Sequence, residues 1–356
     1  MAAPAFHQLR VAAVSPLTDE AVAVELEVPP DLAGEFRYLP GQHVTLRAVL
    51  DGEDLRRSYS ICANASDGKL RVGIKRLPGG AFSTWATTTL AAGDMLEVME
   101  PVGEFVIRPD ETKPKRRVAI AAGSGITPVL SLVATTLEAE PESTWAVLFG
   151  NRESRTVMFL DELEGLKDRY PTRLQLVHVL SREETVVPLF SGRLDRPKLE
   201  ELLERLVDPI SVDEWYLCGP FEMVEAARAT LIDTGVRPDA IKDELFFAGP
   251  LDPSTLPLEP VDGEASVELL FSLDGRLSST RMRPNGPILD AALTVRPELP
   301  FSCRGGMCAS CKARLVEGEV EMKRNWALAD RDLAAGYVLT CQALPLTDVV
   351  QVDYDV

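Results

Sequence analysis

Histidine is scarce in this chain, and its scarcity limits the metal chemistry that the chain can perform. The 356 residues include only three histidines, His7, His43 and His178. None belongs to a Glu-x-x-His pair or to a mixed cysteine and histidine set, the patterns that hold carboxylate di-iron sites and Rieske clusters. We therefore expect no oxygen-activating iron site, so any such chemistry requires a separate protein.

The sequence also lacks the usual signals for export and for membrane insertion. Its first residues, MAAPAFHQLR, contain neither a charged segment followed by an apolar core nor a small-residue cleavage site. The uncharged stretch from Val118 to Leu137 approaches spanning length, but Gly123, Gly125 and Pro128 interrupt it where a spanning helix would be continuous. We interpret this stretch as strand, loop and helix, and expect a cytoplasmic protein without membrane contact.

Basic residues are in deficit. The chain has 37 lysines and arginines against 55 aspartates and glutamates, a formal charge of -18. Such a charge repels nucleic acid and anionic membranes and favours a partner with a basic docking face. The hydrophobic share of 46% and charged share of 26% are those of ordinary globular protein, with room for two or three domains.

Changes in residue pattern divide the chain into domains. Residues 1–110 contain alternating apolar and polar segments separated by turn residues, which predicts an antiparallel β-barrel. Residues 111–248 alternate apolar strands with helical segments, which predicts a doubly wound parallel α/β sheet. The strands expected here are 118–121, 145–149, 174–179 and 215–217, with a helix at 159–170.

A proline-rich segment, residues 249–263, is typical of a linker and leads to a third domain at 264–356. In that domain Ser266–Leu273 and Leu277–Met282 flank Asp274-Gly275 as a predicted hairpin, and Ile288–Leu293 is predicted to be helical. We therefore expect a small α+β domain.

The third domain carries the most specific motif of the sequence, CRGGMCASC. It places Cys303, Cys308 and Cys311 in a C-x4-C-x2-C pattern, with Cys341 thirty residues further on. This is the spacing of plant-type [2Fe-2S] ferredoxins, whose fold is a β-grasp. A structural zinc site is disfavoured because paired C-x2-C knuckles and histidine ligands are lacking. Buried inert cysteines are the remaining alternative.

The first domain contains the motif Arg57-Ser58-Tyr59-Ser60. With the motifs that follow, it resembles the R-x-Y-S signature of the ferredoxin-NADP reductase superfamily, over about residues 5–248. The resemblance implies that Arg57 pairs with the flavin phosphate, that Tyr59 packs on the isoalloxazine ring and that Ser60 offers its hydroxyl to flavin N5. These roles suit the chemistry, because an anion requires a cation and a planar cofactor requires a flat wall.

The segment Gly79-Gly80-Ala81-Phe82-Ser83 follows at the spacing of that family. It resembles the turn whose backbone amides hold the flavin pyrophosphate at a helix N-terminus, so Gly80, Phe82 and Ser83 are predicted to bind the cofactor. The resemblance favours FAD over FMN.

A glycine loop in the second domain, Ala122-Gly123-Ser124-Gly125-Ile126-Thr127-Pro128, directly follows a predicted strand and precedes a predicted helix. This context suits a loop that cradles phosphate, with Gly123, Gly125 and Thr127 as binding residues. Members of the resembled family more often have glycine in the place of Ala122. The alternative is a tight turn without a ligand.

Cys218-Gly219-Pro220 at a strand end and Glu244-Leu245-Phe246-Phe247 complete the resemblance. It implies that Cys218 and Glu244 lie near the nicotinamide, with Gly219 and Pro220 in the binding loop. It also implies that Phe246 or Phe247 covers the flavin, and the sequence does not choose between them. Structurally, the cysteine and the phenylalanines could equally be core residues.

The choice of nucleotide depends on two loops. Ser181-Arg182 resembles the pair that binds the 2′-phosphate in NADPH-specific relatives, and Asn151-Arg152 offers no carboxylate to an unphosphorylated ribose. We expect NADPH, although NADH stays possible if both arginines only solvate loops.

Together these motifs predict a reductase that moves electrons from NADPH through a flavin to a [2Fe-2S] cluster and then to an oxygenase partner. The domain order resembles reductase subunits of bacterial multicomponent oxygenases. The third domain, with CRGGMCASCKARLVEGEVEM, Asn325-Trp326 and the run LAAGYVLTCQALPLT, resembles that of phenylacetyl-CoA epoxidase reductases, and this resemblance spans essentially the whole chain. The alternative within this class is the reductase of a Rieske oxygenase, such as a ketosteroid 9α-hydroxylase. An alternative of another class is an iron-sulfur carrier or sensor with an inactive flavin domain.

Overall fold

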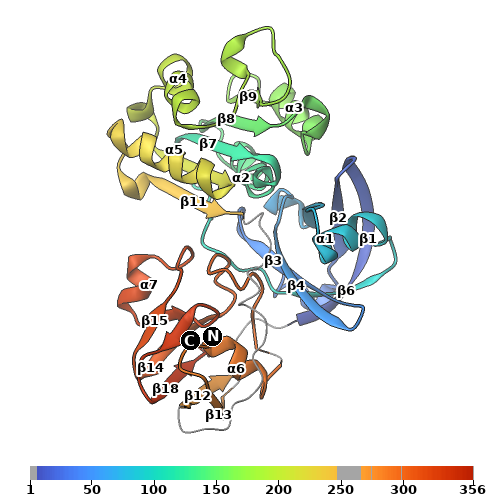
Figure 1. Ribbon diagram of the computed structural model, residues 1–356. Coiled ribbons are helices and arrows are strands. Elements are labelled where there is room, and N and C mark those ends of the chain that lie inside the picture. The colour runs from blue at the N-terminus through green and yellow to red at the C-terminus, as the bar shows by residue number, and fades with distance from the viewer. Residues whose placement is uncertain (1–5, 247–265, 274, 298, 356) are drawn as a thin grey trace. The chain divides into compact units, whose positions relative to one another are not determined.

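The computed structural model describes residues 6–246, 266–273, 275–297 and 299–355, and they form two compact units (Figure 1). The larger unit contains residues 8–55 and 59–246, and the smaller contains Phe6, His7, residues 56–58 and the described residues from 266 onward. The predicted linker at 249–263 and Phe247 lie outside the described residues. The domain boundaries stay predictions.

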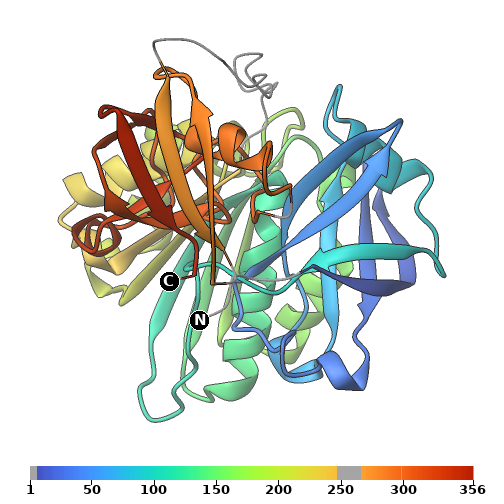
Figure 2. The ribbon, with the colours of Figure 1, turned by 90° about the horizontal axis from the view of Figure 1, so that it is seen from below.

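The first part of the larger unit is a six-stranded antiparallel sheet, drawn with blue and cyan arrows in Figure 2. Its elements are β1 (Phe6–Thr18), β2 (Ala21–Glu27), β3 (His43–Leu50), β4 (Glu53–Ser60), β5 (Leu70–Lys75), β6 (Met95–Met99) and α1 (Ala81–Thr88). The strand order is β4-β3-β6-β1-β2-β5. Ile61, directly after edge strand β4, bridges Val72 on the other edge strand, so the sheet closes into the predicted barrel.

The second part of the larger unit is a five-stranded parallel sheet with the order β11-β10-β7-β8-β9. Its strands are β7 (Arg116–Ala122), β8 (Thr144–Asn151), β9 (Leu174–Leu180), β10 (Glu214–Gly219) and β11 (Ile241–Leu245). The helices are α2 (Ile126–Ala139), α3 (Leu160–Arg169), α4 (Arg196–Leu206) and α5 (Phe221–Asp233). The stretch from Val118 to Leu137 is thus strand, loop and helix, as the sequence predicts.

Both faces of this parallel sheet are covered, because alternate residues of each strand point to opposite sides. Ala119 and Ala121 of β7 pack with residues of α2 and α3, whereas Val118 and Ile120 pack with residues of α4 and α5. The strand order reverses between β7 and β10, and ligands of doubly wound sheets bind at such a reversal, beyond the carboxyl ends of the strands.

The smaller unit is a five-stranded mixed sheet with the order β13-β12-β18-β14-β16 and a short second sheet, β15-β17. Its elements are β12 (Val267–Leu273), β13 (Arg276–Met282), α6 (Ile288–Leu293), β14 (Lys312–Glu317), β15 (Val320–Met322), α7 (Asp330–Ala334), β16 (Tyr337–Leu339), β17 (Ala343–Pro345) and β18 (Val349–Asp353). Ile288 and Ala292 of α6 pack on the sheet. The predicted hairpin and helix are confirmed, and the fold is the expected β-grasp.

Within the described ranges, no helix has both the length and the apolar character required to cross a bilayer.

Candidate functional site

The predicted nucleotide residues lie at one edge of the parallel sheet, where β7, β8, β9 and β10 end; we call it the carboxyl edge. The glycine loop turns here from β7 into α2, and Gly123 has a φ of 55°. A Cβ on Gly125 would lie only 2.1 Å from the carbonyl oxygen of Cys218. Only glycine allows this close approach of two backbones, so the loop from β7 lies directly against the end of β10.

Thr127 and Pro220, both predicted binding residues, shape the loops at this edge. The Thr127 hydroxyl donates a hydrogen bond to the backbone oxygen of Ser124, at 2.9 Å, and the residue is buried. Pro220 occupies the N-cap position of α5, directly after Gly219. Both residues therefore fix the backbone on which a phosphate would rest.

The loops after β8 and β9 are joined by backbone hydrogen bonds. The amide of Ser181 donates to the oxygen of Asn151 at 2.9 Å, and the amide of Arg182 donates to the oxygen of Arg152 at 2.8 Å. The side-chain nitrogen of Asn151 is buried and has no hydrogen-bond partner in the described structure. A buried amide without a partner fits a place where a ligand supplies the acceptor.

Lys75 is a further cation at this edge, and no motif in the sequence pointed to it. Lys75 Nζ lies 3.9 Å from the position that a Cβ on Gly123 would occupy. Burial, and then the nearby Arg152 guanidinium, lower the pKa of Lys75. Lys75 and Arg152 repel each other, and the negative phosphates of a dinucleotide bound at the glycine loop would relieve this repulsion.

Four side chains meet where the barrel and the parallel sheet adjoin. The Ser60 hydroxyl donates a hydrogen bond to Glu244 Oε2 at 3.1 Å, and His43 Nδ1 lies 3.8 Å from Glu244 Oε1. Cys218 is the register partner of Glu244 on the neighbouring strand. The structure thus joins three of the predicted residues, Ser60, Cys218 and Glu244, and adds His43.

Burial, and then the Glu244 carboxylate, raise the pKa of Cys218 well above that of a free thiol. Cys218 therefore stays a neutral thiol, which can contact a nicotinamide without attacking it. The Glu244 carboxylate can accept a proton and hold it beside the Ser60 hydroxyl. FAD bound here would supply a centre that accepts a hydride and releases single electrons.

Phe246 lies beside this group. Its amide donates to the oxygen of Gly219 at 3.0 Å, and its half-buried ring packs against the core that contains Cys218. The position agrees with a flavin cover, and the role stays a prediction.

The flavin motifs lie on β4 and at the start of α1. The rings of Tyr59 and Phe82 are 5.8 Å apart, and Phe82 is buried in the barrel core. Gly80 is the N-cap residue of α1, and the Ser83 hydroxyl donates to its carbonyl oxygen at 3.2 Å. Phe82 and Ser83 thus hold the turn in shape, which leaves its backbone amides as candidates for a phosphate. Arg57 lies on β4, and its pairing with the flavin phosphate stays a prediction.

The smaller unit brings its cysteines together in one loop and the turn that follows β16. The amides of Gly305 and Met307 point at Cys303 Sγ, at 3.3 and 3.4 Å. A hydrogen bond with the Cys308 thiol, together with burial, raises the pKa of Cys303, and one with the Cys311 thiol raises that of Cys341. The four thiols therefore lie next to one another, and the amides would stabilise added negative charge on sulfur.

The donor set fits a [2Fe-2S] cluster. The described residues contain no group of three or more His, Cys, Asp or Glu side chains that could hold one metal ion. A [2Fe-2S] cluster needs only two thiolates for each iron, because sulfides complete the coordination. The buried Ser310 hydroxyl, between Cys308 and Cys311, has no hydrogen-bond partner in the described structure, which suits a donor to cluster sulfur.

His43 and Lys75 are site residues that sequence reasoning missed, and Asn151 was considered there only for its lack of a carboxylate. Asn151 follows an apolar strand, so its place at the end of β8 could have been read from the sequence. Nothing local distinguishes His43 or Lys75, because strand pairing alone brings them to the site.

Family models match the chain in three segments. Residues 9–107 match an oxidoreductase FAD-binding domain, residues 119–229 an oxidoreductase NAD-binding domain, and residues 271–346 a 2Fe-2S iron-sulfur cluster binding domain. These matches confirm flavin, pyridine nucleotide and [2Fe-2S] cofactors for the chain.

Two relatives match this chain over nearly its full length. The chain is 42% identical to a subunit of the 1,2-phenylacetyl-CoA epoxidase of Escherichia coli, over 98% of each chain. It is 33% identical to the ferredoxin reductase component of 3-ketosteroid-9-alpha-monooxygenase of Mycolicibacterium smegmatis, over 98% of this chain and 97% of that one. Both relatives are components of oxygenase systems.

Solved structures agree with the fold. Phthalate dioxygenase reductase, described as a modular structure for electron transfer from pyridine nucleotides to [2Fe-2S], aligns over 98% of both chains with a TM-score of 0.58 and 22% identity. An intact type IV self-sufficient cytochrome P450 monooxygenase aligns over 98% of this chain and 41% of its own, with a TM-score of 0.69 and 21% identity.

Proposed function

Because the chain belongs to the family of flavin and [2Fe-2S] reductase components that includes a subunit of 1,2-phenylacetyl-CoA epoxidase, we propose that it passes electrons from NADPH to a di-iron phenylacetyl-CoA epoxidase. The chain is an oxidoreductase with FAD, nucleotide and cluster domains. The observation that carries the proposal is the 42% identity to the epoxidase component, against 33% to the ketosteroid reductase at equal coverage of this chain.

Residue chemistry supports the order of electron flow. A pyridine nucleotide gives up two electrons as hydride, whereas a [2Fe-2S] cluster accepts one, so a flavin is needed between them. Ser60, Glu244 and Cys218 are neighbours, and this supports hydride transfer to a flavin beside them. A cluster on the same chain replaces a bimolecular encounter with an effective concentration of the order of millimolar.

The partner performs the oxygen chemistry, because the three histidines of this chain form no iron-binding pattern. The charge of -18 favours a partner with a basic docking face. Four cysteines that must remain thiolates favour a reducing compartment, so we place the protein in the cytoplasm.

NADPH is proposed over NADH on the basis of the loops after β8 and β9. Arg182 and Arg152 are cations on linked loops, and neither loop offers a carboxylate at the position after the strand for a free ribose hydroxyl.

Reconstitution tests the proposed partner. The purified reductase would be mixed either with the oxygenase subunits of a phenylacetyl-CoA epoxidase or with a ketosteroid Rieske oxygenase, and NADPH-dependent product formation would be measured. We expect turnover with the epoxidase. Reduction of ferricyanide in the same preparations controls for a competent flavin, and turnover with the Rieske enzyme alone would reject the epoxidase assignment.

The carrier or sensor alternative is tested by the flavin itself. Anaerobic addition of NADPH should bleach the visible absorption of both flavin and cluster. A protein whose cluster responds to dithionite but not to NADPH would favour the alternative.

A further inference from the structure

A cavity of about 200 Å³ lies at the opposite edge of the parallel sheet, where β7, β10 and β11 begin; we call this the amino edge. Its lining has five cationic and two acidic side chains: Ile107, Arg108, Asp110, Lys113, Lys115, Arg117, Glu214, Tyr216 and Lys242. We call the cavity the basic pocket. Such an excess of positive charge stands out in a chain with a formal charge of -18.

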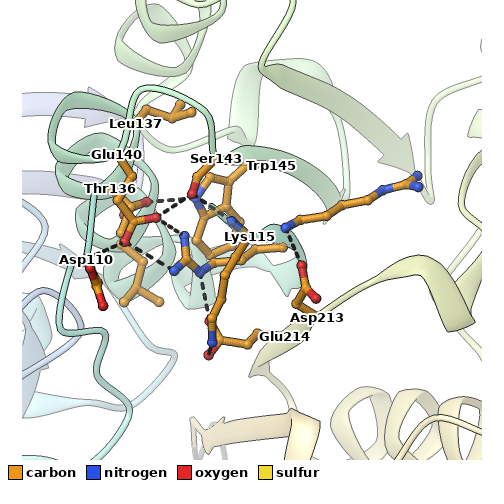
Figure 3. A network of polar contacts seen from close by, with 12 residues as sticks. Asp110, Lys115, Thr136, Leu137, Glu140, Ser143, Trp145, Asp213 and Glu214 are labelled. Carbon is orange, nitrogen blue, oxygen red and sulfur yellow. Dashed lines mark hydrogen bonds and ion pairs between the residues drawn. The ribbon is translucent and has the colours of Figure 1, made fainter. Parts of the chain in front are cut away.

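Ion pairs fix part of this lining. Arg117 bonds to the buried Glu140 at 2.6 Å and to Glu214 at 2.8 Å, and Lys115 Nζ bonds to the same Glu214 at 2.6 Å. Figure 3 shows Lys115 beside Glu214, with Glu140 and Ser143 in the same network. Lys113 pairs with Asp110 at 3.2 Å. Glu214 is thus shared between two cations, and only part of the positive charge is neutralised.

Lys242 has no carboxylate within ion-pair distance among the described residues. Its ammonium donates to the oxygen of Val106 and to the hydroxyl of Tyr216, both at 3.1 Å, and lies 5.2 Å from the centre of the Tyr216 ring. Burial lowers its pKa, and the charges of Lys115 and Arg117 lower it further, although Glu214 opposes them. A half-buried ammonium with only neutral acceptors is poorly compensated.

We propose that the basic pocket binds a compact, free oxyanion of the phosphate type that carries two or more negative charges. Its oxygens would accept hydrogen bonds from three lysines of the lining, Lys242, Lys113 and Lys115. Lys113 and Lys115 would share their ammonium groups between the anion and their present partners, Asp110 and Glu214. The volume of about 200 Å³ holds a phosphate or pyrophosphate, since a water takes about 30 Å³, and is too small for a whole dinucleotide.

The basic pocket is distinct from the nucleotide site. Arg117 lies near the start of β7, whereas the glycine loop follows the end of that strand. Seven residues separate the two edges, a distance of roughly 20 Å at the rise of a strand. Because the net charge of the chain repels anions, binding at the amino edge requires the local arrangement of cations.

The test is a calorimetric titration of inorganic pyrophosphate into the FAD- and cluster-loaded protein at low ionic strength. Saturating NADP⁺ is present throughout, so the carboxyl edge is filled. We expect a dissociation constant below about 1 mM. Lys242→Gln should weaken binding at least about tenfold, since it removes a charge-assisted hydrogen bond.

Lys113→Gln provides a second variant that does not depend on a buried side chain, because Lys113 is largely exposed. It should weaken binding several-fold. Lys69→Gln is the matched control, since Lys69 is exposed and pairs with Glu25 on the barrel. Adenosine diphosphate should bind at least about tenfold more weakly than pyrophosphate because of the limited volume.

Absence of pyrophosphate binding to the wild-type protein would overturn the proposal. So would equal affinities for the Lys113→Gln and Lys69→Gln proteins, because the anion would then not depend on the basic pocket. Binding of adenosine diphosphate as tight as that of pyrophosphate would refute a free, compact ligand.

Discussion

The two edges of the parallel sheet are organised by different kinds of interaction. At the carboxyl edge, glycine, cysteine and backbone groups approach one another closely, and Gly125 leaves no room for a Cβ beside Cys218. At the amino edge, long charged side chains line the basic pocket, and Arg117 joins Glu140 and Glu214. Strands β7 and β10 thus begin with the ion-paired residues Arg117 and Glu214, and they end at the glycine loop and at Gly219.

This contrast follows from what each edge must do. A dinucleotide needs free amides and open space, so small residues are required where phosphates bind. At the amino edge the buried ions Arg117 and Glu140 must be paired, because an unpaired buried ion costs several kcal/mol. Changes to the buried ion pairs of the amino edge should therefore alter stability, whereas changes at the carboxyl edge should alter nucleotide binding.

The largest expected effect is on stability at the amino edge. Arg117→Met leaves Glu140, whose side chain is 1% exposed, without its cation, and should lower the free energy of unfolding by about 3–5 kcal/mol. Denaturant unfolding followed by tryptophan fluorescence measures this, since the Arg117 guanidinium lies 5.9 Å from the Trp145 ring centre.

Arg116→Met is the control for that change, because Arg116 is exposed and should contribute less than about 1 kcal/mol. A double change, Arg117→Met with Glu140→Gln, should recover part of the loss. Equal stabilities of the Arg116 and Arg117 variants would contradict the division between the edges.

The next effect tests the carboxyl edge. Gly125→Ala forces the glycine loop away from Cys218, at a cost of about 1–3 kcal/mol. We expect NADPH affinity and the rate of flavin reduction, measured by stopped-flow absorbance, to fall roughly 10- to 100-fold.

Gly165→Ala provides the comparison, since Gly165 lies within α3 and nothing stands within 4 Å of its missing Cβ. This variant should gain about 0.5–1 kcal/mol of stability with unchanged flavin reduction. If Gly125→Ala reduced its flavin at the wild-type rate, the close approach of the loops would be irrelevant to nucleotide binding.

A smaller effect should distinguish the two nucleotides. Arg182→Ala removes the proposed partner of the 2′-phosphate, worth about 1.5 kcal/mol, so the KM for NADPH should rise about tenfold and that for NADH should not change. Steady-state ferricyanide reduction measures both. Arg205→Ala on α4 is the control, and an equal rise for both nucleotides would count against the 2′-phosphate role.

The smallest effect concerns pH. Although burial opposes it, the hydrogen bonds from Arg117 and Ser143 lower the pKa of Glu140. The pair therefore adds stability above the unfolded pKa of about 4.3, and this stability is lost as pH falls through the lower folded pKa. Glu140→Gln should show a shallower acid dependence of unfolding, and identical slopes would remove Glu140 as the cause.

Local patterns predicted most of the elements. Apolar runs gave β7, β8, β9 and β10 to within a few residues, because a strand buried on both faces is continuous in apolar residues. The pair Asp274-Gly275 predicted the hairpin of β12 and β13, because the tight turn requires a positive φ, and Gly275 has a φ of 68°. The barrel was expected, but its closure through Ile61 and Val72 depends on long-range pairing.

The site was predicted only in part, because short motifs can be recognised in the sequence whereas long-range strand pairing cannot. Residues within short motifs, such as the glycine loop, could be assigned because a local turn fixes their geometry. Cys218 and Glu244 required the family resemblance, because only the parallel pairing of β10 and β11 makes them neighbours. The amino edge was not predicted, since its cations look like solvated loop residues in the sequence.

By itself, the sequence determined the cysteine spacing, the glycine turns and the periodicity of strands and helices, because each depends on residues close together in the chain. Tertiary structure decided that His43, Ser60 and Glu244 meet. It also decided that, among the described residues, Lys242 has only neutral acceptors beside Lys115 and Arg117. These contacts join residues from separate strands, and strand pairing, which acts over long distances in sequence, sets the charge around each group.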